Sequence, residues 1–70
     1  LNVSQLGVFT DGSTVGPEEL IGKGIIRAGL FKVLGDGDLD RKLTVRAPKF
    51  SKAAKAKIEA AGGTIEEFNG

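Results

Sequence analysis

The sequence predicts a small α/β domain, and three observations support this prediction. The chain has 70 residues, a length that allows one domain with a thin core, because about 60% of the unfolded surface is buried at this size. Strand-like and helix-like segments follow in the order strand, strand, helix, strand, with short connections. Glycine is frequent, at 11 residues, which indicates many tight turns. We therefore expect residues 1–70 to form a single domain of short strands and helices joined by irregular strand–strand–helix turns.

The first half of the chain predicts one short helix and one strand. Turn residues, among them those at 11–13, punctuate the opening segment. The stretch 16–19, Gly-Pro-Glu-Glu, is typical of a helix start, with proline at the first helical position and acidic residues in the first turn. Flanking glycines end this helix near Lys23. The apolar segment "LFKVL", residues 30–34, predicts a strand, and its apolar residues on both faces predict that both faces are at least partly covered.

The second half predicts two more strands with a helix between them. "LTVR", residues 43–46, alternates apolar and polar side chains as a half-buried strand does, and Pro48 closes it. Ser51 is a natural N-cap of the helix that follows, and Gly62 stands where a left-handed residue ends a helix. "TIEEF", residues 64–68, predicts a last short strand. The helix residues expected to face the core follow helical spacing: Phe50, Ala54, Ile58 and Ala61.

Charge is strongly segregated along the chain, although the net charge is only +1. Residues 1–40 carry three cations and six acids, a sum of −3, and residues 58–70 carry three acids, a sum of −3. Residues 41–57 carry seven cations and no acid, a sum of +7. A block of this kind, which we call the basic segment, attracts polyanions.

The basic segment contains the candidate binding residues. Lysines crowd the predicted helix start, where positive charge opposes the helix dipole. That end of a helix offers free N–H groups to an anion, and a phosphate backbone would suit both features. The alternative is a merely solvated lysine face. Base stacking has little support from composition, because the four Phe residues are mostly needed for the core and Tyr and Trp are absent. The residues expected to contact phosphate are Arg41, Lys42, Arg46, Lys49, Ser51, Lys52 and Lys55.

Composition argues against an enzyme. The chain has no His and no Cys, so a histidine-activated serine, a disulfide framework and a thiolate zinc site are all excluded. "GKG" at residues 22–24 lacks the spacing of a phosphate loop. No apolar run is long enough to span a membrane, and no signal-peptide pattern opens the chain. We expect a cytoplasmic protein without cofactor, metal or small-molecule substrate.

One acidic loop resembles the start of a calcium loop. "GDGDLD" places Asp36, Asp38 and Asp40 at alternating positions. The sixth position of such a loop should be glycine and is Arg41, and the twelfth should be glutamate and is Ala47. A solvated loop between two strands is therefore the preferred interpretation.

From residue 32 to residue 62 the residue types and spacings follow a defined signature. The signature has Lys and two aliphatics, a Gly-x-Gly turn, alternating aliphatics, an apolar–Ser pair, and then Ala, an aliphatic and Gly at helical spacing. The matching residues are Lys32, Val33, Leu34, Gly35, Gly37, Leu39, Leu43, Val45, Phe50, Ser51, Ala54, Ile58 and Gly62. With these residues the chain resembles large-subunit ribosomal protein fifteen of the bacterial type. The match covers 31 of the 70 residues, and the upstream segment is also similar to the family.

This resemblance implies a structural constituent of the large ribosomal subunit that binds large-subunit rRNA, within a ribonucleoprotein that serves translation. Neighbouring large-subunit ribosomal proteins would be further partners. The family's long basic N-terminal extension is absent here, so we expect the chain to be the C-terminal globular part of a longer ribosomal protein. The alternative is a protein-interaction domain that docks neighbouring proteins without direct RNA contact.

Overall fold

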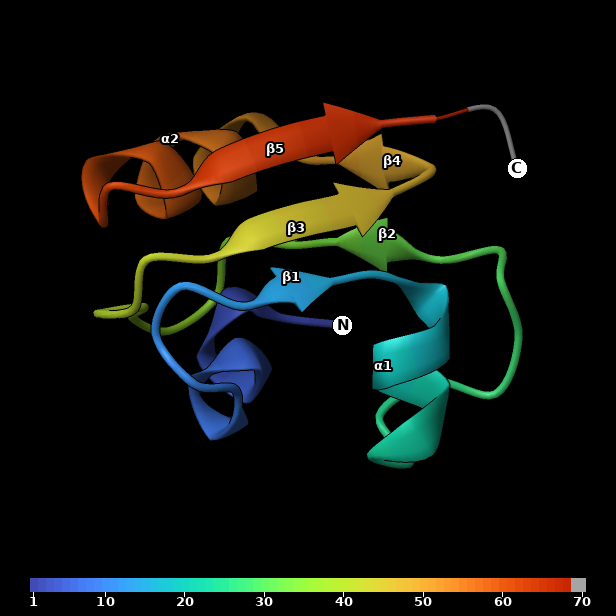
Figure 1. Cartoon of the computed structure of the whole chain (residues 1–70). Helices are drawn as coiled ribbons and strands as arrows, with labels where there is room; N and C mark the ends of the chain where they lie inside the picture. Colours follow the sequence, from blue (N-terminus) through green and yellow to red (C-terminus); the bar gives the residue numbers. More distant parts are fainter. Residues whose placement is uncertain (69–70) are drawn as a thin grey trace.

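The computed structural model describes residues 1–68 and contains short helices and parallel strands (Figure 1). The elements in chain order are the 3-10 helix η1 (Val3–Val8), β1 (Thr14–Val15), α1 (Pro17–Gly22), β2 (Lys32–Val33), β3 (Thr44–Ala47), β4 (Lys49–Phe50), α2 (Lys52–Ala60) and β5 (Thr64–Glu67). This arrangement confirms the predicted α/β class.

The larger sheet is parallel, with strand order β1-β3-β5. Val15, Val45 and Ile65 lie side by side in register and face the core. α2 contributes Ala54 and Ile58 to the same core, both fully buried, and the ribbon of α2 lies behind β5 in Figure 1. Because side chains alternate along a strand, the opposite face carries polar residues. We call this opposite surface the outer face of the sheet.

A second, two-stranded parallel sheet joins β2 to β4. Val33 pairs with Phe50, and both side chains are buried. Lys32 pairs with Lys49 one residue earlier, so both lysine side chains point away from the core. The Ser51 amide donates to the Val33 carbonyl at 2.9 Å. The start of α2 is thus attached directly to the end of β2.

Four predicted elements are confirmed. α1 begins at the predicted proline and ends at Gly22, capped by Lys23. β3 buries Val45 and exposes Arg46, as the alternation indicated. Helix α2 has Ser51 as its N-cap, and Gly62 beyond its end has φ +86°. β5 covers the predicted last strand except its final residue.

The strand predicted at residues 30–34 is shorter in the structure, and its side chains are more exposed than predicted. Only Lys32–Val33 form β2, with Leu34 adding one bridge to Asn2. Leu30 is 78% exposed and Leu34 is 42% exposed, so one face of this segment is open, contrary to the prediction. The reason is that β2 pairs with a strand of only two residues and only the Val33 side packs on the core.

The loop after β2 packs tightly against α2. Gly35 lies so close to the first turn of α2 that an added Cβ would come within 2.8 Å of the Ala53 carbonyl carbon. The Lys57 ammonium donates to the Gly37 carbonyl, and Gly37 itself has φ +81°. The glycines of this Gly-x-Gly turn therefore serve close approach and a left-handed bend.

Candidate nucleic-acid interface

Lysines gather where β2 and β4 meet the first turns of α2. Lys32 and Lys49 are strand neighbours, and Lys52 is the first residue of α2. Lys55 follows one turn later and is half-buried. We call Lys32, Lys49, Lys52 and Lys55 the lysine surface. Lys49 was predicted at the helix start but lies on β4, because Phe50 pairs with Val33 before the helix begins.

Ser51 fixes the start of α2 beside these lysines. Its Oγ accepts a hydrogen bond from the Ala54 amide at 3.1 Å, as an N-cap does. The hydroxyl hydrogen remains available, because a hydroxyl can donate as well as accept. Ser51 can therefore cap the helix and donate to an anion at the same time.

No acid neutralises the lysine surface by direct contact. Across residues 1–68 the structure contains one ion pair, between Arg46 and Glu66. Like charges directly opposite each other in a sheet are destabilising, and Lys32 and Lys49 stand in that relation. Positive charge at the first residue of α2 also opposes the helix dipole. This arrangement is unfavourable for the isolated chain and suits an anionic ligand.

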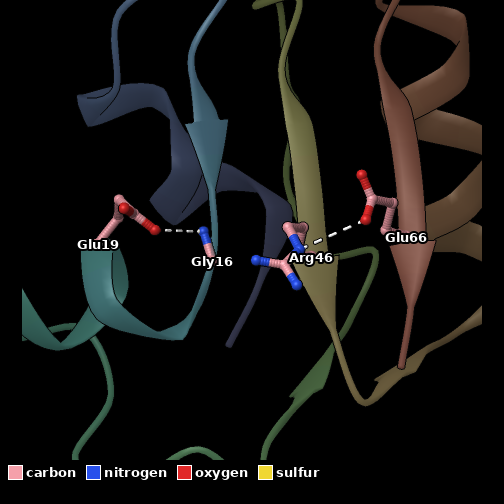
Figure 2. Close-up of polar contacts among 4 residues, drawn as sticks. All are labelled: Gly16, Glu19, Arg46 and Glu66. Atoms are coloured by element: carbon pink, nitrogen blue, oxygen red, sulfur yellow. Dashed lines mark hydrogen bonds and ion pairs between the residues drawn. The ribbon is translucent and has the colours of Figure 1, made fainter. Parts of the chain in front are cut away.

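Arg46 lies apart from the lysine surface, on the outer face of the sheet. Figure 2 shows its side chain between β1 and β5, with Nε 3.4 Å from Glu66 Oε1. Its guanidinium carbon also lies 5.8 Å from the ring centroid of Phe68, a cation–π distance. Gly16 stands on its other side, where the Gly16 amide donates to Glu19 at 2.8 Å (Figure 2).

Arg41 and Lys42 lie at the opposite end of α2 from Lys49. The Lys42 amide donates to Asp11 Oδ1 at 2.5 Å, and its side chain passes next to Gly62, which follows the end of α2. Since α2 has nine residues, the two ends are about 13 Å apart. The seven predicted residues thus occupy three places: Lys49, Ser51, Lys52 and Lys55 at the start of α2, Arg46 on the sheet, and Arg41 with Lys42 beyond the helix end.

Two open hollows flank Phe68 at the end of β5. The first, which we call the lysine hollow, has a volume of about 380 Å³ and is lined by Lys32, Pro48, Lys49, Phe50, Glu67 and Phe68. The second, of about 390 Å³, is lined by Arg46 and Phe68 together with residues 16–19 and Thr14. Phe68 borders both hollows, whereas Arg46 borders only the second.

Two residues of this region were missed by sequence reasoning. Lys32 precedes the basic segment by nine positions, and only the strand register brings it to Lys49. Phe68 was predicted only as the end of the last strand, but it lies half-buried at the edge of both hollows. Charge counting along the sequence could not detect either position, because both depend on strand pairing.

Residues 1–68 offer neither a metal cluster nor a membrane span. In this part of the chain, no three His, Cys, Asp or Glu side chains lie close enough together to hold a metal ion. The helices described here are also all too short or too polar to cross a membrane.

Comparison with known proteins shows the family. The model of the family described as "Ribosomal proteins 50S-L15, 50S-L18e", together with their 60S counterpart, matches residues 1–66. The large ribosomal subunit protein uL15 of Geobacter sulfurreducens is 54% identical over 72 aligned positions, which cover 99% of this chain and 48% of that relative. The chain belongs to this family of ribosomal proteins, and the resemblance noted from its signature residues is confirmed. The chain spans about half the length of this relative.

Proposed function

We propose that this protein is a structural constituent of the large ribosomal subunit and binds large-subunit rRNA through the lysine surface. The observation that carries the proposal is the in-register pair Lys32 and Lys49 beside Lys52, with no acid in ion-pair contact within residues 1–68. The lysines of such a cluster neutralise RNA phosphates, and this neutralisation releases counterions that were condensed on the RNA. Membership of a ribosomal protein family supports this role. The role is structural, needs no catalytic residue, and would be exercised in the cytoplasmic ribosome.

The other predicted phosphate contacts are assigned by their surroundings. Arg41 and Lys42 are exposed at the far end of α2 and would contact a second stretch of backbone. Ser51 would donate its hydroxyl hydrogen to a phosphate oxygen while capping α2. Arg46 is left out of the proposed interface, because Glu66 and Phe68 already engage its guanidinium.

Salt-titrated binding to large-subunit rRNA tests the lysine surface. Each lost phosphate contact lowers the slope of log K against log salt by about 0.7–0.9. The double variant Lys49→Gln/Lys52→Gln should therefore lower the slope by about 1.4–1.8. The matched control Lys23→Gln/Arg27→Gln removes the same charge from exposed positions outside the surface. Equal slopes for the two double variants would contradict the proposal.

We also propose that neighbouring ribosomal proteins contact the open face of the β2 segment. Leu30 is 78% exposed and Leu34 is 42% exposed. Leu34 forms a bridge to Asn2 directly after β2, and Leu30 lies two residues before β2. Exposed apolar side chains favour a protein contact over a phosphate contact.

A further inference from the structure

The lysine hollow combines three kinds of group that nucleotide recognition needs. Lys32 and Lys49 stand at its rim, and neither side chain forms a hydrogen bond or ion pair within residues 1–68. Ammonium groups of this kind bind a backbone phosphate as point charges. The hollow measures about 380 Å³, near the lower end of the range of about 300–1,000 Å³ for ligand pockets. Its size and charge suit a single nucleotide.

Phe68 supplies a surface for base stacking. The Phe68 amide donates to the Ala47 carbonyl at 3.1 Å, so the backbone at this position is fixed beside β3. Arg46 and Phe68 both line the second hollow, and the Arg46 guanidinium carbon lies 5.8 Å from the centroid of the Phe68 ring. Phe68 also lines the lysine hollow, which Arg46 does not line, so the guanidinium does not occupy that hollow. Stacking of an unpaired base on an aromatic ring tolerates any base.

Glu67 supplies discrimination between bases. Its side chain is exposed, lines the same hollow, and has no ion-pair or hydrogen-bond partner within residues 1–68. An ionised carboxylate only accepts hydrogen bonds, and its two oxygens can accept from two adjacent donors. Among the four RNA bases, guanine alone presents two adjacent donors, N1–H and the N2 amino group, on its Watson–Crick edge. Adenine, cytosine and uracil each place a single donor group beside acceptors.

From these groups we propose that the lysine hollow binds one unpaired guanine nucleotide of an RNA. The base stacks on Phe68, its Watson–Crick edge donates to Glu67, and its flanking phosphates contact Lys32 and Lys49. The inference rests on the proposed RNA binding and deepens it, because it adds base recognition to phosphate contacts that carry no sequence information. Proteins commonly read the Watson–Crick edges of splayed-out bases in this way.

Four RNA hairpins that differ only in one looped-out nucleotide test the proposal. The unmodified chain should bind the guanine hairpin roughly tenfold more tightly than the adenine, cytosine and uracil hairpins. Glu67→Gln should bring all four affinities within about twofold of one another, because the amide nitrogen opposes a guanine donor. Phe68→Ala should weaken all four by roughly tenfold through lost stacking. Equal binding of the four hairpins by the unmodified chain would overturn the proposal.

Glu66→Gln is the matched control for Glu67→Gln. It makes the same change in net charge on the neighbouring residue, which lines neither hollow and pairs with Arg46 instead. The control should keep the guanine preference, and retention of that preference by Glu67→Gln would refute the role of Glu67. Guanosine monophosphate should bind more weakly than the guanine hairpin, since it carries only one of the two phosphates that flank a nucleotide within a chain. Equal affinity would identify a free nucleotide as the ligand and overturn the RNA assignment.

A fully paired duplex separates failure of this inference from failure of the proposed function. If the duplex binds with the expected dependence on Lys49 and Lys52 but the four hairpins bind alike, only the guanine site is refuted. If no RNA binds at low salt, both proposals are refuted. Heteronuclear NMR spectra of each variant establish that the fold is retained, and Glu67 is exposed, so its replacement leaves the core unchanged.

Discussion

Replacement of Gly35 by alanine is expected to destabilise the domain through one steric contact. An added Cβ would lie 2.8 Å from the Ala53 carbonyl carbon and 2.9 Å from the Ala54 amide nitrogen, and closer still to the Ala53 methyl group. Two of these three neighbours are backbone atoms of α2, so a side-chain rotation cannot relieve the overlap. The first turn of α2 must move away from the loop after β2.

The magnitude follows from two opposing effects. Overpacking of a tight contact costs about 1–3 kcal/mol, while alanine lowers the entropy of the unfolded chain and returns about 0.4–1 kcal/mol. We expect a net loss of about 1–2 kcal/mol, a large part of the total for a domain whose residues contribute about 0.05–0.15 kcal/mol each. The melting temperature should fall by about 5–15 °C.

Far-UV circular dichroism during urea and thermal unfolding measures this loss, since the chain has no Trp or Tyr to serve as a fluorescent reporter. Gly22→Ala is the matched control: Gly22 ends α1, and an added Cβ there has no neighbour within 4 Å. The control should be neutral or slightly stabilising, because alanine favours helix more than glycine does. A second replacement, Ala53→Gly, should restore part of the stability of Gly35→Ala. If Gly35→Ala were as stable as Gly22→Ala, the steric reasoning would be refuted.

Two further predictions concern the helix cap and the open leucines. Ser51→Ala should lower the free energy of unfolding by about 1 kcal/mol through loss of the bond to the Ala54 amide; unchanged urea unfolding would show that this bond contributes nothing. Leu30→Ser should change stability by less than about 0.5 kcal/mol, because Leu30 is largely exposed. A photo-crosslinking residue at the same position should attach to protein in assembled large subunits, and attachment to RNA alone would contradict the proposed protein contact.

Elements with local signals were the ones that the sequence predicted well. The proline at the start of α1, the serine before α2 and the glycine after it act through nearby backbone groups, so their effect is visible in the sequence. η1, β1 and β4 were missed. β1 and β4 have two residues each and exist only because Thr14 pairs with Thr44 and Lys49 with Lys32, about 30 and 17 positions away.

The candidate site likewise has parts that local sequence signals predict and parts that depend on strand pairing. The density of lysines before and inside α2 is a local property, and it located most of the lysine surface. The separation of Arg46 from that surface is not local, since the register of β3 with β5 places Glu66 directly opposite Arg46. The hollow beside Phe68 likewise requires β4 and β5 to end next to each other. Sequence patterns therefore indicated the charge, and strand register decided where it lies.

The lysine surface should lower the stability of the fold while it favours RNA binding. This combination distinguishes a binding surface from a merely solvated lysine face. Lys49 opposite Lys32 costs about 0.2–1 kcal/mol, and Lys52 at the first residue of α2 costs about 0.3–1 kcal/mol against the helix dipole. The variant Lys49→Gln/Lys52→Gln should therefore unfold at higher urea concentration than the unmodified chain, while it binds rRNA more weakly. On a merely solvated face the replacement would also raise stability, because the cost lies within the chain, but rRNA binding would stay unchanged. A face that stabilises the fold would lower both. Only a surface that meets an anion is expected to move the two measurements in opposite directions.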